Sequence, residues 1–154
     1  MDLLEELKKI CEKLDQNHIE YALCGGLALA VYAKPRATLD IDIMVDPACT
    51  DKARKAVEAL GFTLPSAPMK LQGGAVHIER LTKVDDITGE HLSLDFLLVT
   101  PEIKKAWENR ITVEWEGGNL SVVSPQGLIL LKSFRRSGQD IDDIAYLRSI
   151  TDED

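Results

Sequence analysis

Long apolar runs are missing from this sequence. The longest, Gly26–Ala33 and Phe96–Val99, fall far short of the roughly 20 residues that a membrane-spanning helix needs. The first residues, Met1–Glu6, are acidic and lack the basic-then-apolar order of a secretion signal. We therefore expect a cytoplasmic protein without a membrane-spanning segment.

Positive charge is also scarce. The 154-residue chain has 18 Lys and Arg residues against 26 Asp and Glu residues, which gives a formal net charge of −8. Binding of duplex DNA requires many phosphate contacts from Lys and Arg. The composition therefore argues against a duplex-DNA partner, although it leaves room for a small basic patch.

Cysteine and histidine number only three each. The cysteines are odd in number and lack Cys-x-x-Cys spacing, which is typical of reduced thiols in a cytosolic protein: Cys11, Cys24 and Cys49. The histidines are too scattered to predict a zinc site: His18, His77 and His91.

What the sequence does contain is the patterning of one mixed domain. Its length, with 45% apolar and 29% charged residues, is typical of a single globular domain. The pattern predicts helices over 2–17, 27–33, 51–60, 101–109, 125–137 and 140–150. It predicts strands over 19–24, 39–45, 62–64, 75–84, 91–99, 111–115 and 120–123, with loop or an edge hairpin over 65–74. Because helices and strands do not alternate strictly, we expect an α+β domain rather than a doubly wound sheet.

Two local features refine this prediction. Thr50 is expected to cap the helix over 51–60. The acidic residues 151–154 are expected to form a frayed tail.

Two carboxylates occupy an unusual place. Asp40 and Asp42 interrupt the apolar strand over 39–45, and alternation puts both on one face. Their like charges repel unless a cation lies between them. A third carboxylate, Asp95, interrupts the strand over 91–99, so the three converge if the two strands are neighbours. The alternative is a solvated strand face that carries exposed acids.

A divalent cation would relieve this repulsion. Magnesium is usually held by a few carboxylates together with water and substrate phosphates. Two such ions can serve phosphoryl transfer by activating the attacking oxygen and stabilising the leaving one.

A glycine pair precedes the acidic strand. Gly25 and Gly26 follow a buried strand and open a helix, and backbone N–H groups at a helix N-terminus stabilise phosphate. The alternative is that the pair only makes a tight turn.

These elements follow one another as strand, Gly-Gly, helix, basic turn and Asp-x-Asp strand. They read Leu23-Cys24-Gly25-Gly26-Leu27-Ala28-Leu29-Ala30, then Lys34-Pro35-Arg36-Ala37-Thr38-Leu39-Asp40-Ile41-Asp42-Ile43. This order, over residues 19–45, resembles the signature of the polymerase-β-type nucleotidyltransferase superfamily. In particular it resembles small bacterial nucleotidyltransferases related to AbiEii-type toxins. The resemblance implies a mixed β-sheet flanked by helices, in one nucleotidyltransferase domain over residues 1–150.

The resemblance also implies a metal site. Asp40, Asp42 and Asp95 would be catalytic and would bind Mg²⁺ or Mn²⁺. Asp95 would in addition help to deprotonate the acceptor hydroxyl.

The remaining implied roles concern the nucleotide. Gly25 and Gly26 would cradle the triphosphate, with Gly26 standing where many superfamily members have serine. Lys132 would contact the nucleotide or would be a surface lysine with an apolar stem. Arg36 would contact phosphate or brace an aspartate.

The implied reaction moves a nucleoside monophosphate from a nucleoside triphosphate, ATP among them, to a hydroxyl acceptor and releases pyrophosphate. The acceptor stays open among RNA, protein and a small molecule. A role in toxin–antitoxin or phage-defence systems, with a cognate partner protein, is implied by the AbiEii-like features. The competing interpretations are a non-catalytic nucleotide-binding or regulatory module on the same fold, and an acidic interaction domain such as an antitoxin.

Overall fold

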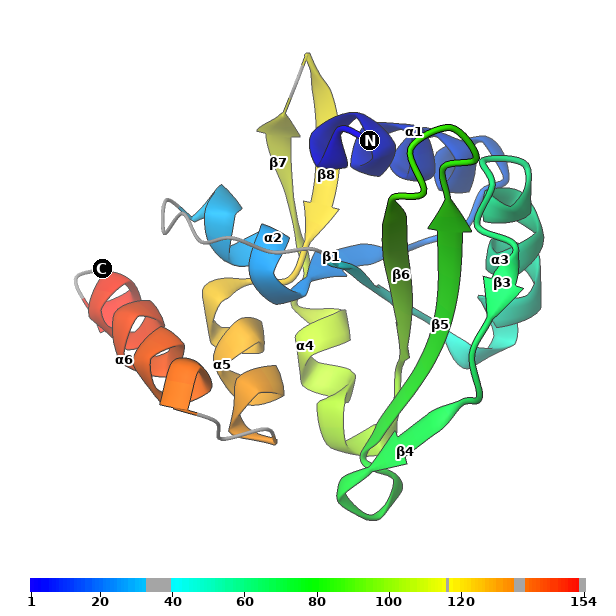
Figure 1. Cartoon of the computed structure of the whole chain (residues 1–154). Helices are drawn as coiled ribbons and strands as arrows, with labels where there is room; N and C mark the ends of the chain where they lie inside the picture. The colour runs from blue at the N-terminus through cyan, green and yellow to red at the C-terminus, as the bar shows by residue number, and fades with distance from the viewer. Residues whose placement is uncertain (33–39, 116, 135–137, 153–154) are drawn as a thin grey trace.

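A single mixed sheet organises the molecule. The computed structural model describes residues 1–32, 40–115, 117–134 and 138–152. Its eight strands run in the order β3-β5-β6-β2-β1-β8-β7, with β4 paired to β5 (Figure 1). They are β1 Ala22–Cys24, β2 Asp40–Val45, β3 Leu64–Pro65, β4 Met69–Leu71, β5 Val76–Val84, β6 His91–Leu98, β7 Ile111–Trp115 and β8 Gly118–Val122. The predicted α+β class is confirmed.

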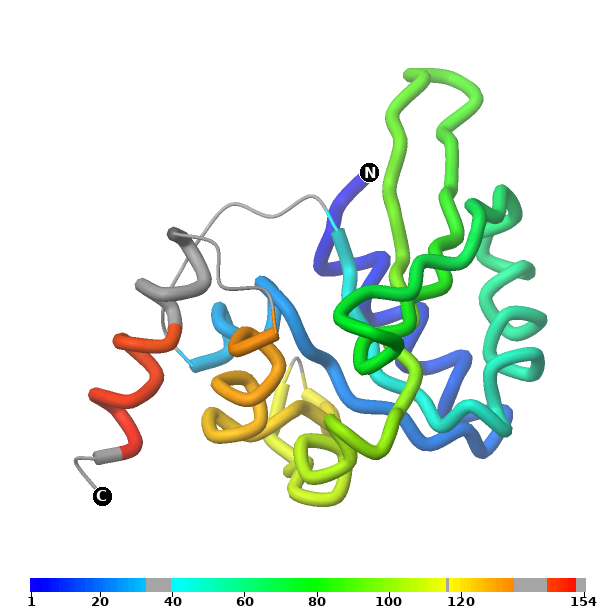
Figure 2. The backbone as a smooth tube through the Cα atoms, turned by 90° about the horizontal axis from the view of Figure 1, so that it is seen from below, coloured from blue at the N-terminus to red at the C-terminus, as the bar shows by residue number. Residues whose placement is uncertain are grey.

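Helices flank this sheet. They are α1 Leu3–Gln16, α2 Gly25–Val31, α3 Thr50–Glu58, α4 Lys104–Glu108, α5 Pro125–Ser133 and α6 Gly138–Asp152. Figures 1 and 2 show α1 and α3 on one side of the molecule and α5 and α6 on the other. Within the described residues, none of these helices combines the length and the apolar character needed to cross a membrane.

The α1 side holds much of the apolar core. The predicted amphipathic helix buries one stripe, Leu7, Ile10, Cys11 and Leu14. Asp2 caps the helix by accepting from the backbone N–H groups of Leu4 and Glu5. Alternate residues of β2 and β6 complete the core, all at 0% exposure: Ile41, Ile43, Leu94 and Phe96. Burial of one face of β2 and β6 leaves their other face for the aspartates.

Several predicted boundaries move. Thr50 does not cap α3, because its hydroxyl donates to the carbonyl of Pro47 and the residue lies inside the helix. The second helix begins at Gly25 rather than at residue 27, so the glycine pair forms its first turn. Gly138 opens α6 instead of ending α5, and α6 continues to Asp152, into the expected tail.

The segment over 65–74 contains the expected edge hairpin. Residues Met69–Leu71 form β4, which pairs antiparallel with the start of β5. The three cysteines are not joined in disulfides, as predicted.

Candidate active site

One row of residues crosses the sheet from β1 to β5. Asp42 on β2 lies opposite Asp95 on the parallel strand β6 and opposite Cys24 on the antiparallel strand β1. Asp95 in turn lies opposite Arg80 on β5. Residues paired across neighbouring strands project from the same face, so this acidic row presents two carboxylates side by side. The predicted neighbourhood of Asp42 and Asp95 is confirmed.

Rows on either side of the acidic row differ in polarity. Asp40 pairs with Ser93 two residues before Asp42 and Asp95, so one end of this face is polar. In the other direction, Leu97 pairs with both Met44 and Ile78, which makes the next row apolar. The acids therefore lie at a boundary between polar and apolar surface.

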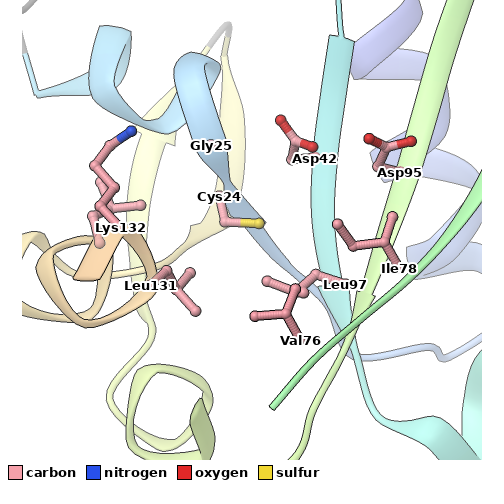
Figure 3. Close-up of a pocket in the computed structure, with 10 residues that line it drawn as sticks. Cys24, Gly25, Asp42, Val76, Ile78, Asp95, Leu97, Leu131 and Lys132 are labelled. Atoms are coloured by element: carbon pink, nitrogen blue, oxygen red, sulfur yellow. The ribbon is translucent and has the colours of Figure 1, made fainter. Parts of the chain in front are cut away.

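A pocket opens over this boundary (Figure 3). Asp42 and Asp95 project into it from the sheet, and Gly25 and Lys132 line it from α2 and α5. Apolar side chains supply the rest of the described lining: Val76, Ile78, Leu97, Leu128 and Leu131. Asp40 lies on the same sheet face but is not part of this lining.

Gly25 is fitted closely against Asp42. Its φ of +68° is a backbone conformation that L side chains rarely adopt. A Cβ built on Gly25 would lie 2.8 Å from Cγ and 2.9 Å from Cβ of Asp42. The glycine therefore serves both the turn into α2 and the approach of that turn to the carboxylate.

Lys132 is buried rather than exposed. Its residue exposure is only 4%, which excludes the alternative of a surface lysine. Figure 3 shows its amino group directed from α5 toward α2, the helix that begins at Gly25. The pocket thus has a cationic side group opposite its two carboxylates.

Arg80 is a site residue that the sequence analysis missed. Its Nε donates to Oδ1 of Asp95 at 2.7 Å, and its Nη2 donates to Oδ2 at 3.0 Å. This hydrogen-bonded pair raises the pKa of Arg80, and the charges of Asp95, Asp40 and Asp42 add to the effect. The alternation of β5 could have shown that Arg80 shares a face with Ile78, but not that β5 neighbours β6 in this register.

Cys24 is not placed to act as a nucleophile. Burial raises the pKa of its thiol well above the ordinary value, and the charges of Asp42 and Asp95 raise it further. A thiol of this kind stays protonated near neutral pH, whereas the nucleophilic form is the thiolate.

Comparison with known proteins agrees with this geometry. The family model "Nucleotidyltransferase of unknown function (DUF6036)" matches residues 1–151. The chain belongs to this family. No curated protein matches it.

Solved nucleotidyltransferase structures share the fold. A Thermotoga maritima protein assigned to the nucleotidyltransferases, TM1012, is 16% identical with a TM-score of 0.60, and the match covers 98% of this chain and 93% of that one. The crystal structure of ANT(2'')-Ia in complex with adenylyl-2''-tobramycin is 16% identical with a TM-score of 0.59, over 94% and 87% of the two chains. The solution structure of the antibiotic-resistance factor ANT(2'')-Ia is 14% identical with a TM-score of 0.62, over 98% and 86%.

The nucleotidyltransferase fold implies a divalent metal, and the acidic row can be tested for it. Among the described residues, no group of three His, Cys, Asp or Glu side chains is arranged to hold a metal ion. Magnesium does not require such a cage, because one or two carboxylates together with substrate phosphates usually suffice. Asp42 and Asp95, adjacent on one face and directed into one pocket, fit that requirement. The donors are carboxylate oxygens, as a hard cation prefers.

One predicted site residue, Arg36, lies outside the residues that this structure describes. Gly26 lies in the first turn of α2 and is buried. Of the other predicted site residues, Gly25, Asp42, Asp95 and Lys132 share the pocket, while Asp40 lies beside it.

Proposed function

We propose that this nucleotidyltransferase moves a nucleoside monophosphate from a nucleoside triphosphate to a hydroxyl acceptor, with release of pyrophosphate. The proposal rests above all on the in-register pair Asp42 and Asp95, which lines the same pocket as Gly25 and Lys132. Carboxylates that face a buried lysine and a helix-opening glycine provide acidic and phosphate-binding groups in one cavity. Nucleotidyl transfer requires this combination of groups.

The donor triphosphate is assigned to the side of the pocket formed by α2 and α5. Backbone N–H groups of the first helical turn have no partner within their own helix, so they are available to phosphate in general. Gly25 and Gly26 begin that turn in α2. The ammonium group of Lys132 is directed toward the same helix and adds positive charge where pyrophosphate would leave.

The reaction on the acidic side is an in-line substitution. The acceptor oxygen forms a bond to the α-phosphorus, and the bond from that phosphorus to the bridging oxygen of pyrophosphate breaks. Asp95 accepts the acceptor's proton, and the negative charge of the leaving group is balanced beside Lys132. Asp40 and Asp42 would hold Mg²⁺ or Mn²⁺, which when bound neutralises phosphate charge and polarises the α-phosphorus. The protein's own contribution is positioning and electrostatic stabilisation.

The variant Asp42→Asn tests this proposal. Because the amide is nearly the same size and the acidic row loses one charge, we expect the fold to be kept and transfer to fall at least 100-fold. Each labelled triphosphate is incubated with Mg²⁺ and cell extract, and incorporation of labelled monophosphate into macromolecules and small molecules is measured. Asp51→Asn, an exposed change on α3, is the matched control and should keep full incorporation.

Ligand-induced stabilisation gives a second measurement. A triphosphate with Mg²⁺ at about 100 times its Kd should stabilise the folded protein by about 2.7 kcal/mol, and so raise its melting temperature. The stabilisation should be lost in Asp42→Asn and kept in Asp51→Asn. A folded wild-type protein that no triphosphate stabilises would count against the proposal.

A non-catalytic nucleotide-binding or regulatory module is the second candidate. The bidentate engagement of Asp95 by Arg80 favours it, since a carboxylate in such a pair is already partly satisfied. Stabilisation by a triphosphate without incorporation of label into any acceptor would identify this function.

The acceptor class is proposed more broadly. RNA, protein and small-molecule hydroxyls all remain candidates, and the labelled extract distinguishes them by sensitivity to ribonuclease and to protease. A cytoplasmic role in a toxin–antitoxin or phage-defence pair, related to AbiEii-type toxins, is proposed on the sequence resemblance. It predicts growth arrest on expression of the wild type but not of Asp42→Asn, and relief by a cognate partner.

A further inference from the structure

Arg80 and Asp95 form the best-defined polar contact of the pocket region. Both carboxylate oxygens are engaged, at 2.7 and 3.0 Å, by two nitrogens of one guanidinium. The Asp95 side chain is 7% exposed, and that of Arg80 is 34% exposed. The pair therefore joins a buried carboxylate to a cation that reaches the solvent.

The register fixes this contact. Arg80 and Asp95 are direct partners in the antiparallel ladder of β5 and β6, and Asp42 follows Asp95 in the same row. The guanidinium thus lies at one end of the acidic row, with Asp95 between it and Asp42. A bidentate pair of this kind sets the plane of the carboxylate as well as its charge environment.

We infer that Arg80 has two roles toward Asp95: it positions the carboxylate for the reaction, and it acts as an internal counter-cation that competes with the divalent ion for this carboxylate. The inference rests on the proposed function. An ionised carboxylate has about four acceptor sites, so the two hydrogen bonds from Arg80 leave others directed elsewhere. Its positive charge nevertheless repels a second cation at the same group.

The two roles can be separated by substitution. Arg80→Lys keeps the charge but loses the planar fork that orients the carboxylate. Arg80→Gln loses both. Arg54→Gln is the matched control, because Arg54 on α3 contacts Glu79, whose side chain leaves β5 on the opposite face from Arg80.

Metal binding is measured directly by Mn²⁺ titration with electron paramagnetic resonance, without turnover. Removing a unit charge a few ångströms from a divalent ion should tighten Mn²⁺ binding by about tenfold in Arg80→Gln. Arg80→Lys and Arg54→Gln should stay within about twofold of the wild type. Unchanged Mn²⁺ affinity in Arg80→Gln would overturn the counter-cation role. If that variant does not fold, Arg80→Met, which keeps the apolar stem, takes its place in the titration.

Positioning is read from turnover. Incorporation of labelled monophosphate should fall about tenfold or more in both Arg80→Lys and Arg80→Gln, with the triphosphate KM little changed. Full turnover in Arg80→Lys would overturn the positioning role. Failure of the proposed function is distinguishable, because Asp42→Asn would then alter neither Mn²⁺ binding nor nucleotide-induced stabilisation.

Discussion

Gly25 and Asp42 are in such close contact that no side chain fits between them. The glycine has φ +68°, and a Cβ there would come within 2.8 Å of the carboxyl carbon of Asp42. The residue that opens α2 and the carboxylate of β2 are therefore coupled sterically. A change at one displaces the other.

Gly25→Ala should impair the site beyond its effect on stability. The left-handed backbone conformation would destabilise the alanine variant by about 1–2 kcal/mol, and the new methyl group would push the Asp42 side chain from its position. We expect Mn²⁺ binding and nucleotide-induced stabilisation to be lost, as measured by titration and thermal unfolding.

Gly73→Ala is the matched control for this change. Gly73 has a similar φ, +66°, but nothing lies within 4 Å of a Cβ built on it. It should show comparable destabilisation and normal ligand binding. Equal ligand binding in both variants would contradict the coupling of Gly25 to Asp42.

Lys132→Met should weaken nucleotide binding without unfolding the protein. The substitution keeps the apolar stem on α5 and removes the buried charge that faces α2. We expect the triphosphate Kd to rise about tenfold or more, measured by calorimetry with a non-hydrolysable analogue and Mg²⁺. Lys70→Met, an exposed change on β4, should leave the Kd unchanged. An unaltered Kd in Lys132→Met would remove this lysine from the nucleotide site.

Alkaline pH should destabilise the fold. Burial raises the pKa of Cys11 from its usual 9.0 to about 11, and burial also raises the pKa of Tyr21. The folded state then favours the protonated thiol, so its stabilising contribution is complete below about pH 9 and declines as the pH rises toward 11. For Cys11 alone the contribution is roughly 3 kcal/mol.

The measurement is the urea midpoint between pH 7 and 11. It should be steady up to about pH 9 and then decrease. Cys11→Ala should begin from a lower midpoint, because it leaves a cavity, and should lose less between pH 9 and 11. Parallel pH profiles for the two proteins would refute the assignment to Cys11.

A buried ion pair should hold α1 against the β5–β6 hairpin. Nζ of Lys83 donates to both carboxylate oxygens of Glu6, at 2.9 and 3.0 Å, and Glu6 is only 5% exposed. Lys83→Met would leave that carboxylate buried without its partner and lower the free energy of unfolding by about 3–5 kcal/mol. The double variant Glu6→Leu with Lys83→Met should recover most of the loss in chemical denaturation. Additive losses would mean that the two side chains do not stabilise each other.

Local sequence patterns predicted most of the elements. The apolar spacing of α1 and the glycine turn before β8 both describe contacts close in sequence, and both are confirmed. The alternation of Asp40 and Asp42 with isoleucines was enough to put the acids on one face of β2. These predictions needed only the periodicity of a helix or a strand.

The site could be predicted only in part, because strand neighbours are not encoded locally. Asp95 stood out as a lone acid in an apolar strand, whereas Arg80 occurs in a strand with other polar residues and gave no such signal. Its role depends on the order β5-β6-β2, which brings together segments separated along the chain. The burial of Lys132 likewise depends on the packing of α5 over the pocket, which its helical spacing left open.

The central place of β2 links the chemistry to the correctness of folding. Its isoleucines fill the core on one face while its aspartates face the pocket on the other. A slip of one residue against β6 would exchange the two sets, driving carboxylates into the apolar interior and isoleucines toward the ligand. A misaligned chain would therefore lose both its stability and its reactivity, so assays of activity also count the correctly paired molecules in a preparation.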